Sequence, residues 1–265
     1  MARLAQRQRY YHPNRIQFRL KVGQIDEKPG GEGGDRGKRG KHAGDWGAAE
    51  LIKLVRKLQP GIIVNNRLGL DDYADGGDFV TPEQVSSAEL VEYKGKTWET
   101  CQTFSGSWGY YRDEMSWKTH RQLLDLLITS AANGGNLILN VGPTARGEFD
   151  YRAKAALDSL AYWMHANSKA IYGCTFAPDE FKAPENDKLT YNPRTKRLYI
   201  HLYDYPSDGR LLLSGYSGKV RYAQLLNDDS EVRIEPAGNS SDITLKLPVQ
   251  KPRYEIPVVE LILGP

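Results

Sequence analysis

Apolar residues recur at helical spacing in three stretches between residues 45 and 173. The first stretch, residues 45–60, opens with a capping Asp45 and stops at Pro60. A start signal, an apolar period near 3.6 residues and a stop signal are together typical of an amphipathic helix. The residues expected on its buried face are Leu51, Leu54, Val55 and Leu58.

The same pattern predicts two further helices, within residues 116–135 and 150–173. Their apolar positions again fall three and four residues apart, which places them on one side of a helix. The buried face expected for the earlier helix consists of Leu123, Leu124, Leu127, Ile128 and Ala131. The buried face expected for the later helix consists of Leu157, Leu160, Ala161 and Met164.

Short apolar segments alternate with these helices, at residues 61–66, 97–104 and 136–143. They have the length of strands. Strands that alternate with amphipathic helices indicate a parallel sheet covered by helices. This part of the chain is therefore predicted to be a β/α region.

The pattern changes after about Cys174, where the helical period ends. Seven short alternating segments follow, at residues 188–193, 197–204, 209–215, 219–227, 230–236, 241–248 and 258–263. Turn clusters such as "PSDG", "NDDS" and "GNSS" separate them. This spacing predicts an antiparallel β-sandwich of about ninety residues. The fold class is thus α/β, with a β/α region at 45–174 and a sandwich at 175–265.

Charge separates the first 44 residues from the rest. The whole chain of 265 residues has a net charge of +3, but residues 1–45 carry 11 Lys+Arg against 5 Asp+Glu, and residues 46–265 carry 25 against 28. The basic arm, 1–44, is also rich in glycine, so a solvated loop or disorder is expected there. Such an arm can alternatively contact RNA or phosphates. No nucleic-acid partner is expected for the body.

The number of cysteines, the length of the apolar runs and the first thirty residues exclude several classes of protein. Cys101 and Cys174 are too few for a disulfide framework or a metal site, so both are interpreted as free, buried thiols. No metal or other cofactor is expected. The sequence lacks an apolar run of membrane-spanning length, so no membrane partner is expected. The first thirty residues also lack the apolar stretch of a secretory signal, and a cytoplasmic location is the default.

The segment "GDFVTPEQ" contains the most informative carboxylate, Glu83. Pro82 fixes its own backbone angle and biases Thr81 away from the helical region, so Glu83 lies in a stiff loop. A carboxylate held in this way is either part of a surface turn or an acid directed at a substrate. The segment alone leaves both interpretations open.

Four sequence motifs, in order along the chain, decide between these two interpretations of Glu83. They are "LVRKLQPGIIVNNRLG", "GDFVTPEQ", "WETCQTFSGSWGYYRDE" and "LLITSAANGGNLILNVGPTARGEF", followed by "AIYG". Through them, residues 46–174 resemble the catalytic domain of the α-L-fucosidase family of glycoside hydrolases, and residues 175–265 resemble its C-terminal domain. The resemblance implies the C-terminal part of a (β/α)8-type barrel, which places its chemistry after the carboxyl ends of the strands.

The resemblance also implies roles for individual residues. Arg67 would hold sugar hydroxyls, with a salt bridge at the barrel rim as the alternative. Glu83 matches the general acid/base, and Glu99 is the second choice. Trp108 would line the sugar pocket and desolvate Glu83. Asn136 and Asn140 are interpreted as hydrogen bonders at the rim.

A retaining glycosidase needs a second carboxyl group about 5 Å from the first, as the nucleophile. In the family this is an aspartate at a strand end, upstream of the helix that here begins at Trp46. The matching Trp-x-Asp is absent, and Asp26 is the nearest carboxylate in register, whereas Asp35 lies among glycines. The expected activity is retaining release of terminal α-L-fucose from fucosylated glycans or small α-L-fucosides.

Length leaves an alternative open. A complete barrel takes about 250 residues, and fewer than 175 precede the predicted sandwich. The chain could therefore be a truncated, catalytically impaired remnant that binds fucose through Arg67 and Trp108 but lacks the nucleophile. Pairing of two copies would cover the open strand edges of a partial barrel, so a homo-oligomer is expected.

Overall fold

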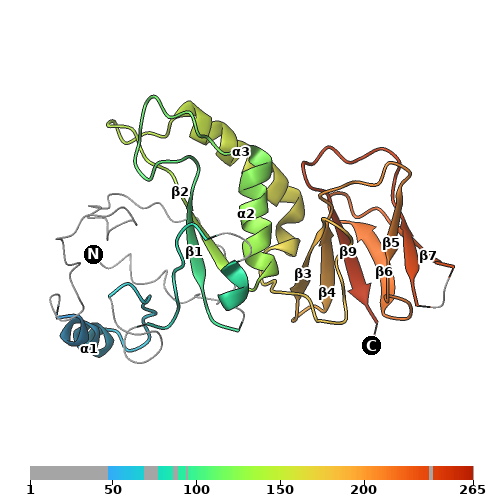
Figure 1. Ribbon diagram of the computed structural model, residues 1–265, viewed down its shortest axis with the longest axis horizontal. Coiled ribbons are helices and arrows are strands. Elements are labelled where there is room, and N and C mark those ends of the chain that lie inside the picture. The colour runs from blue at the N-terminus through green and yellow to red at the C-terminus, as the bar shows by residue number, and fades with distance from the viewer. Residues whose placement is uncertain (1–46, 69–76, 86–88, 94, 239–240, 265) are drawn as a thin grey trace.

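The computed structural model describes residues 47–68, 77–85, 89–93, 95–238 and 241–264. Its helices are α1 (Ala48–Leu58), η3 (Glu89–Tyr93), α2 (His120–Ala132), α3 (Tyr151–Asn167) and η4 (Ser168–Ala170). Its strands are β1 (Glu99–Thr103), β2 (Asn136–Asn140), β3 (Lys188–Asn192), β4 (Arg197–His201), β5 (Arg210–Leu213), β6 (Val220–Leu225), β7 (Arg233–Pro236), β8 (Ile243–Lys246) and β9 (Val258–Leu263). In Figure 1, α2 and α3 lie between the β1–β2 pair and the C-terminal sheets.

The first predicted helix is present as α1, but its predicted buried face is wrong. Ala48 and Ile52 are the buried residues of α1, while Leu51, Leu54 and Leu58 are 43%, 51% and 71% exposed. The reason is that α1 lies apart from α2 and α3, on the far side of the β1–β2 pair (Figure 1). The expected cap, Asp45, lies outside the described residues.

The second predicted helix is confirmed as α2, and all five residues expected on its inner face are at most 2% exposed. Its start is fixed by a capping box, in which the Thr119 hydroxyl accepts from the Gln122 amide and the Gln122 side chain accepts from the Thr119 amide.

The third helix is present as α3, with Leu160 and Met164 buried as predicted. Ala161 is exposed, contrary to the prediction, because α3 turns Trp163 into the core instead.

Strands β1 and β2 form a parallel pair, in register from Glu99↔Asn136 to Thr103↔Asn140. Helix α2 connects them, as the alternating pattern predicted. Gly135, directly before β2, permits this packing, since a Cβ there would lie 2.1 Å from the ring of Trp98. The carboxyl ends of both strands therefore lie at one edge of the pair.

Beyond β1, parallel pairing continues only as isolated bridges in the described residues: Glu83↔Cys101, Val80↔Trp98 and Asn65↔Phe79. The regular strand predicted at residues 61–66 is wrong, because only Asn65 pairs. Around it, the Asp78 amide donates to Val64 and the Asn66 amide donates to Phe79, and the ladder ends there. The architecture is β/α, and its described strands do not close a barrel.

Each of the seven segments predicted after Cys174 contains a strand, and the strands form two antiparallel sheets. One sheet has the order β3-β4-β9-β6, and the other has the order β5-β8-β7. Side chains from both sheets meet in one buried cluster that includes Leu198, Leu213, Leu225, Leu245 and Leu261. The sheets therefore pack face to face, which confirms the predicted sandwich.

The other face of the four-stranded sheet packs against α2 and α3. One buried cluster combines Leu127 and Trp163 from the helices with Tyr199 and Val258 from the sheet. The Trp163 indole also donates to the Ile256 carbonyl at 2.8 Å. The β/α part and the sandwich thus share a core.

Both cysteines are buried thiols that form no disulfide with each other, as predicted. Among the described residues, no helix is long and apolar enough to cross a membrane.

Candidate active site

An ion pair between Arg67 and Glu83 joins the first two candidate residues. Arg67 Nη1 lies 3.0 Å from Glu83 Oε2. The same guanidinium donates through Nε to the Thr81 hydroxyl at 2.7 Å and through Nη2 to the Thr81 carbonyl at 3.1 Å. Arg67 is therefore held in one orientation along the loop that carries Glu83.

The loop of Glu83 is attached to β1 by its backbone. The Cys101 amide donates to the Pro82 carbonyl at 3.2 Å, and the Gln84 amide donates to the Cys101 carbonyl at 3.0 Å. Pro82 is buried and lacks an amide hydrogen, so it packs here without leaving a donor unpaired. Glu83 projects from a rigid support, as the proline predicted.

The expected desolvation of Glu83 by Trp108 is not what the structure shows. The Glu83 side chain is 46% exposed and that of Arg67 is 39% exposed, so water reaches both partners of the pair. An exposed pair of this kind contributes only about 0–1 kcal/mol to stability. The arrangement is therefore better suited to presenting two charged groups than to stabilising the fold.

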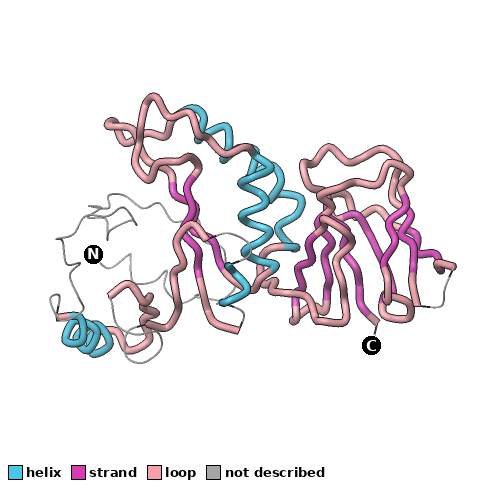
Figure 2. The backbone as a smooth tube through the Cα atoms, viewed as in Figure 1, coloured by secondary structure: helices cyan, strands magenta, loops and turns pink. Residues whose placement is uncertain are grey.

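The loop that follows β1 folds back over the carboxyl ends of β1 and β2. Figure 2 shows it as a long irregular segment between β1 and α2. At its centre is the carboxylate of Glu114, which is 7% exposed. Its Oε2 accepts from the Ser107 hydroxyl at 2.6 Å, and its Oε1 accepts from the Ser116 amide at 2.8 Å. Glu114 thereby closes the loop into a compact turn.

Hydroxyl donors fix the charge state of this carboxylate. The Ser107 hydroxyl, followed by the Ser116 hydroxyl and amide, lowers the pKa of Glu114 from 4.5 to about 2. The cause is that each donor stabilises the ionised form. Glu114 is thus an anion at neutral pH and serves as an acceptor rather than as an acid.

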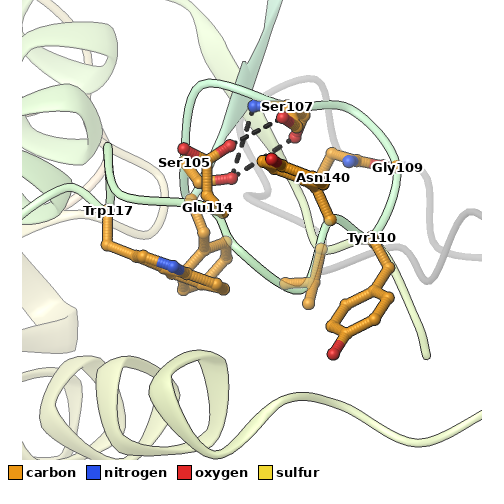
Figure 3. Close-up of a pocket in the computed structure, with 11 residues that line it drawn as sticks. Ser105, Ser107, Gly109, Tyr110, Glu114, Trp117 and Asn140 are labelled. Atoms are coloured by element: carbon orange, nitrogen blue, oxygen red, sulfur yellow. Dashed lines mark hydrogen bonds between the residues drawn. The ribbon is translucent and has the colours of Figure 1, made fainter.

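A small hollow lies beneath this loop (Figure 3). Its lining includes Ser107, Tyr110, Glu114, Trp117 and Asn140. The volume open to water is about 10 Å³, which holds about one water molecule and no sugar.

Glycine at position 142 lets the loop approach β2 this closely. A Cβ on Gly142 would lie 2.3 Å from the carbonyl carbon of Gly109, a distance that real contacts do not reach. The Asn140 amide also donates to the Trp108 carbonyl at 2.6 Å. This contact agrees with the prediction that Asn140 forms hydrogen bonds at this edge. Asn136 is buried at the start of β2, and its side-chain amide donates to the Trp98 carbonyl at 3.3 Å.

The structure brings Arg67 and Glu83 together and holds Trp108 in the loop after β1. Trp108 is partly buried, and the hollow of Figure 3 is lined by its neighbours rather than by Trp108 itself. Convergence of all three side chains on one sugar site stays a prediction. Glu99, the second choice for the acid, is the first residue of β1 and is bonded into the sheet through its amide, which donates to the Val80 carbonyl at 3.0 Å.

The predicted nucleophile, Asp26, lies outside the described residues, as does Asp35. In the parts of the chain that the structure describes, no group of three His, Cys, Asp or Glu side chains could hold a metal ion. The residue that sequence reasoning missed is Glu114. It lies in the phrase "WETCQTFSGSWGYYRDE", but its partner Ser107 is seven residues away in an irregular loop, where no periodicity marks the pairing.

Comparison with known proteins gives this geometry a context. A profile described as alpha-L-fucosidase matches residues 10–169. Alpha-L-fucosidase from Dictyostelium discoideum is 30% identical over 207 residues, which cover 75% of this chain and 44% of that protein. Human plasma alpha-L-fucosidase is 28% identical over 157 residues, which cover 57% of this chain and 33% of that protein.

A solved structure agrees with the sequence relatives. Alpha-L-fucosidase isoenzyme 1 from Paenibacillus thiaminolyticus superimposes with a TM-score of 0.74 and 32% identity, over 87% of this chain and 57% of that one. The chain belongs to the alpha-L-fucosidase family of glycoside hydrolases. It spans less than half the length of the two curated relatives described above.

Proposed function

We propose that this chain acts as a retaining α-L-fucosidase that releases terminal α-L-fucose from fucosylated glycans or small α-L-fucosides. The observation that carries the proposal is the Arg67–Glu83 pair, 3.0 Å apart and open to solvent, on a loop bridged to β1. Family membership supports the substrate class. The β/α region corresponds in this proposal to the C-terminal part of a (β/α)8-type barrel.

The two charged groups have complementary roles in the proposed reaction. The Arg67 guanidinium donates hydrogen bonds to sugar hydroxyls, and Glu83 protonates the glycosidic oxygen as its bond to the anomeric carbon breaks. A second carboxylate attacks that carbon from the opposite face and forms a glycosyl-enzyme intermediate. Glu83 then accepts a proton from the water molecule that hydrolyses this intermediate. Asp26 is the proposed second carboxylate.

Release of L-fucose from the trisaccharide 2′-fucosyllactose tests the proposal. We expect turnover by the full chain and a loss of about 10²–10⁴-fold in Glu83→Gln, the usual contribution of a general acid. Glu255→Gln is the matched control, because Glu255 is also a half-exposed glutamate paired with an arginine, 3.5 Å from Arg121. The control should retain wild-type activity.

Two results would change the assignment. Unchanged turnover in Glu83→Gln would remove Glu83 from the chemistry and leave Glu99 as the next candidate. Binding of L-fucose in a calorimeter, with no turnover by the wild-type chain, would instead identify a fucose-binding remnant that lacks its nucleophile.

Association of copies is part of the same proposal. Helix α1 presents Leu51, Leu54 and Leu58 to solvent, and together they form an apolar stripe at helical spacing. Burying such a stripe between two copies would remove apolar surface from water, which favours a homo-oligomer.

A further inference from the structure

A second hollow lies far from the Arg67–Glu83 pair along the chain, where the end of α3 meets the four-stranded sheet. It is an open cleft of about 620 Å³, within the range of about 300–1,000 Å³ typical of small-molecule sites. One wall includes Tyr172, in the turn that follows η4, and the floor is the helix-facing side of the sheet. The lining residues that carry the argument are Tyr172, Asn192, Arg197, Tyr199, Gln224 and Glu260.

A buried carboxylate lies in the floor of this cleft. The Glu260 side chain is 8% exposed. Its Oε2 accepts from the Gln224 amide at 2.7 Å, and its Oε1 accepts from the Tyr199 hydroxyl at 3.3 Å. Burying a charged group is costly unless hydrogen bonds compensate it, so these contacts hold Glu260 in place with acceptor capacity left over.

Arg197 forms only a long ion pair with that carboxylate. Its Nε lies 3.8 Å from Glu260 Oε1, beyond the range of a good charge-assisted hydrogen bond. Its Nη1 is buried and has no hydrogen-bond partner in the part of the chain that the structure describes. A buried donor without a partner is uncommon in folded proteins. The Arg197 side chain as a whole is 31% exposed and lines the cleft, so the accessible part of its guanidinium can donate to a ligand there.

An aromatic ring and an amide complete the site. Tyr172 is 40% exposed, so its ring presents an apolar face at the cleft. Asn192 adds side-chain N–H donors, since its Oδ1 already accepts from the backbone amides of Arg194 and Thr195 at 3.1 and 3.3 Å. Charges of both signs, from Arg197 and Glu260, face the same space, which disfavours a simple anion or cation. Planar polar groups beside an aromatic ring match a ligand with many hydroxyls and an apolar ring face.

We propose that this cleft is a non-catalytic binding site for a neutral saccharide. The Tyr172 ring contacts the apolar face of the sugar, while Arg197, Asn192 and Glu260 exchange hydrogen bonds with its hydroxyls. None of its lining residues belongs to the loops of Arg67, Glu83 or Trp108. The site therefore stands whether or not the chain hydrolyses fucosides.

Binding of N-acetyllactosamine to the full chain tests the proposal, by saturation-transfer NMR and calorimetry. This disaccharide carries no fucose, so a fucosidase site is not the intended receptor. We expect binding that weakens at least tenfold in Tyr172→Ala and in Arg197→Ala. Tyr172→Phe, which keeps the ring, should stay within twofold of wild type. Tyr151→Ala, which removes a 76% exposed tyrosine outside the cleft, is the matched control and should bind normally.

The remaining outcomes overturn the proposal. No saccharide signal at millimolar concentration would exclude the site, as would binding that survives both cleft variants. Loss of binding in Arg67→Ala together with retention in Tyr172→Ala would place the sugar at the proposed fucosidase site instead. Binding of inorganic phosphate in preference to N-acetyllactosamine would identify an anion site. Unchanged circular dichroism of Tyr172→Ala ensures that a loss of binding is not a loss of fold.

Discussion

At the scale of single residues, the two glutamates of the β/α part have opposite environments. Glu83 projects into solvent beside Arg67, whereas Glu114 is enclosed by donors from Ser107 and Ser116. Two glutamates at one edge of the sheet can therefore serve different purposes. Glu83 is available to a substrate, and Glu114 shapes the loop that covers the strand ends.

The pKa of Glu114 leads to a prediction about acid stability. Its folded-state pKa, about 2, lies below its ordinary value of 4.5. A carboxylate of this kind stabilises the folded state fully above about pH 4.5 and loses that contribution as the pH falls toward 2. Glu114→Gln should therefore be less stable than wild type at pH 7, and the difference should shrink between pH 4.5 and 2.5.

Melting temperatures of both proteins across this pH range measure the effect. Asp113→Asn, which changes the adjacent, exposed carboxylate, is the control and should follow wild type. A difference between wild type and Glu114→Gln that stays constant from pH 7 to 2.5 would show that the serine donors do not hold the ionised form.

The sequence could single out Arg67 and Glu83 as candidates because both lie in motifs with a fixed order and spacing. It could not reveal that they pair with each other, since the sixteen-residue separation includes irregular backbone. It also could not reveal the partly unpaired guanidinium of Arg197, which depends on how β4, β6 and β9 lie side by side. A local sequence pattern does not reveal contacts between strands that are distant in sequence.

At the scale of elements, periodicity succeeded wherever an element packs on a regular neighbour. The residues expected on the inner face of α2 are all buried, and buried and more exposed residues alternate along β5 and β8, so the apolar period of these elements reports burial directly. The prediction for α1 had the right helix but the wrong environment. Its period is amphipathic, yet in the described structure its stripe of Leu51, Leu54 and Leu58 has no covering element.

This contrast predicts different responses to substitution in α1 and α2. Leu124→Ala in α2 removes a side chain with 0% exposure and should cost about 2–5 kcal/mol of unfolding free energy. At protein concentrations low enough to keep the chain monomeric, replacing Leu51, Leu54 and Leu58 together by glutamine should cost no more than about 0.5 kcal/mol per site, because these side chains are exposed in a single copy. Urea unfolding measures both.

Size-exclusion chromatography of the α1 variant tests the proposed association. The wild-type chain should elute as an oligomer and the triple variant as a monomer, because the variant removes the apolar stripe. A wild-type monomer, or a variant that elutes with the wild-type oligomer, would show that copies do not associate through α1.

At the scale of the whole molecule, the sandwich supports the candidate site indirectly. Its four-stranded sheet packs on α2 and α3, and Arg121 of α2 donates to the Tyr203 carbonyl at 2.9 Å. Lys188 of β3 also pairs with Asp125 of α2. The helices beside the β1–β2 pair are thus held from behind by the sandwich.

The proposed role of Glu83 is to protonate the leaving group of a fucoside. A sugar alcohol is a poor leaving group and needs that proton, whereas nitrophenol leaves readily without it. The decisive measurement is kcat/KM of Glu83→Gln relative to wild type on 2′-fucosyllactose and on 4-nitrophenyl α-L-fucoside. We expect a loss of about 10²–10⁴-fold on the trisaccharide and a much smaller loss on the nitrophenyl fucoside. Equal losses on both substrates would contradict it.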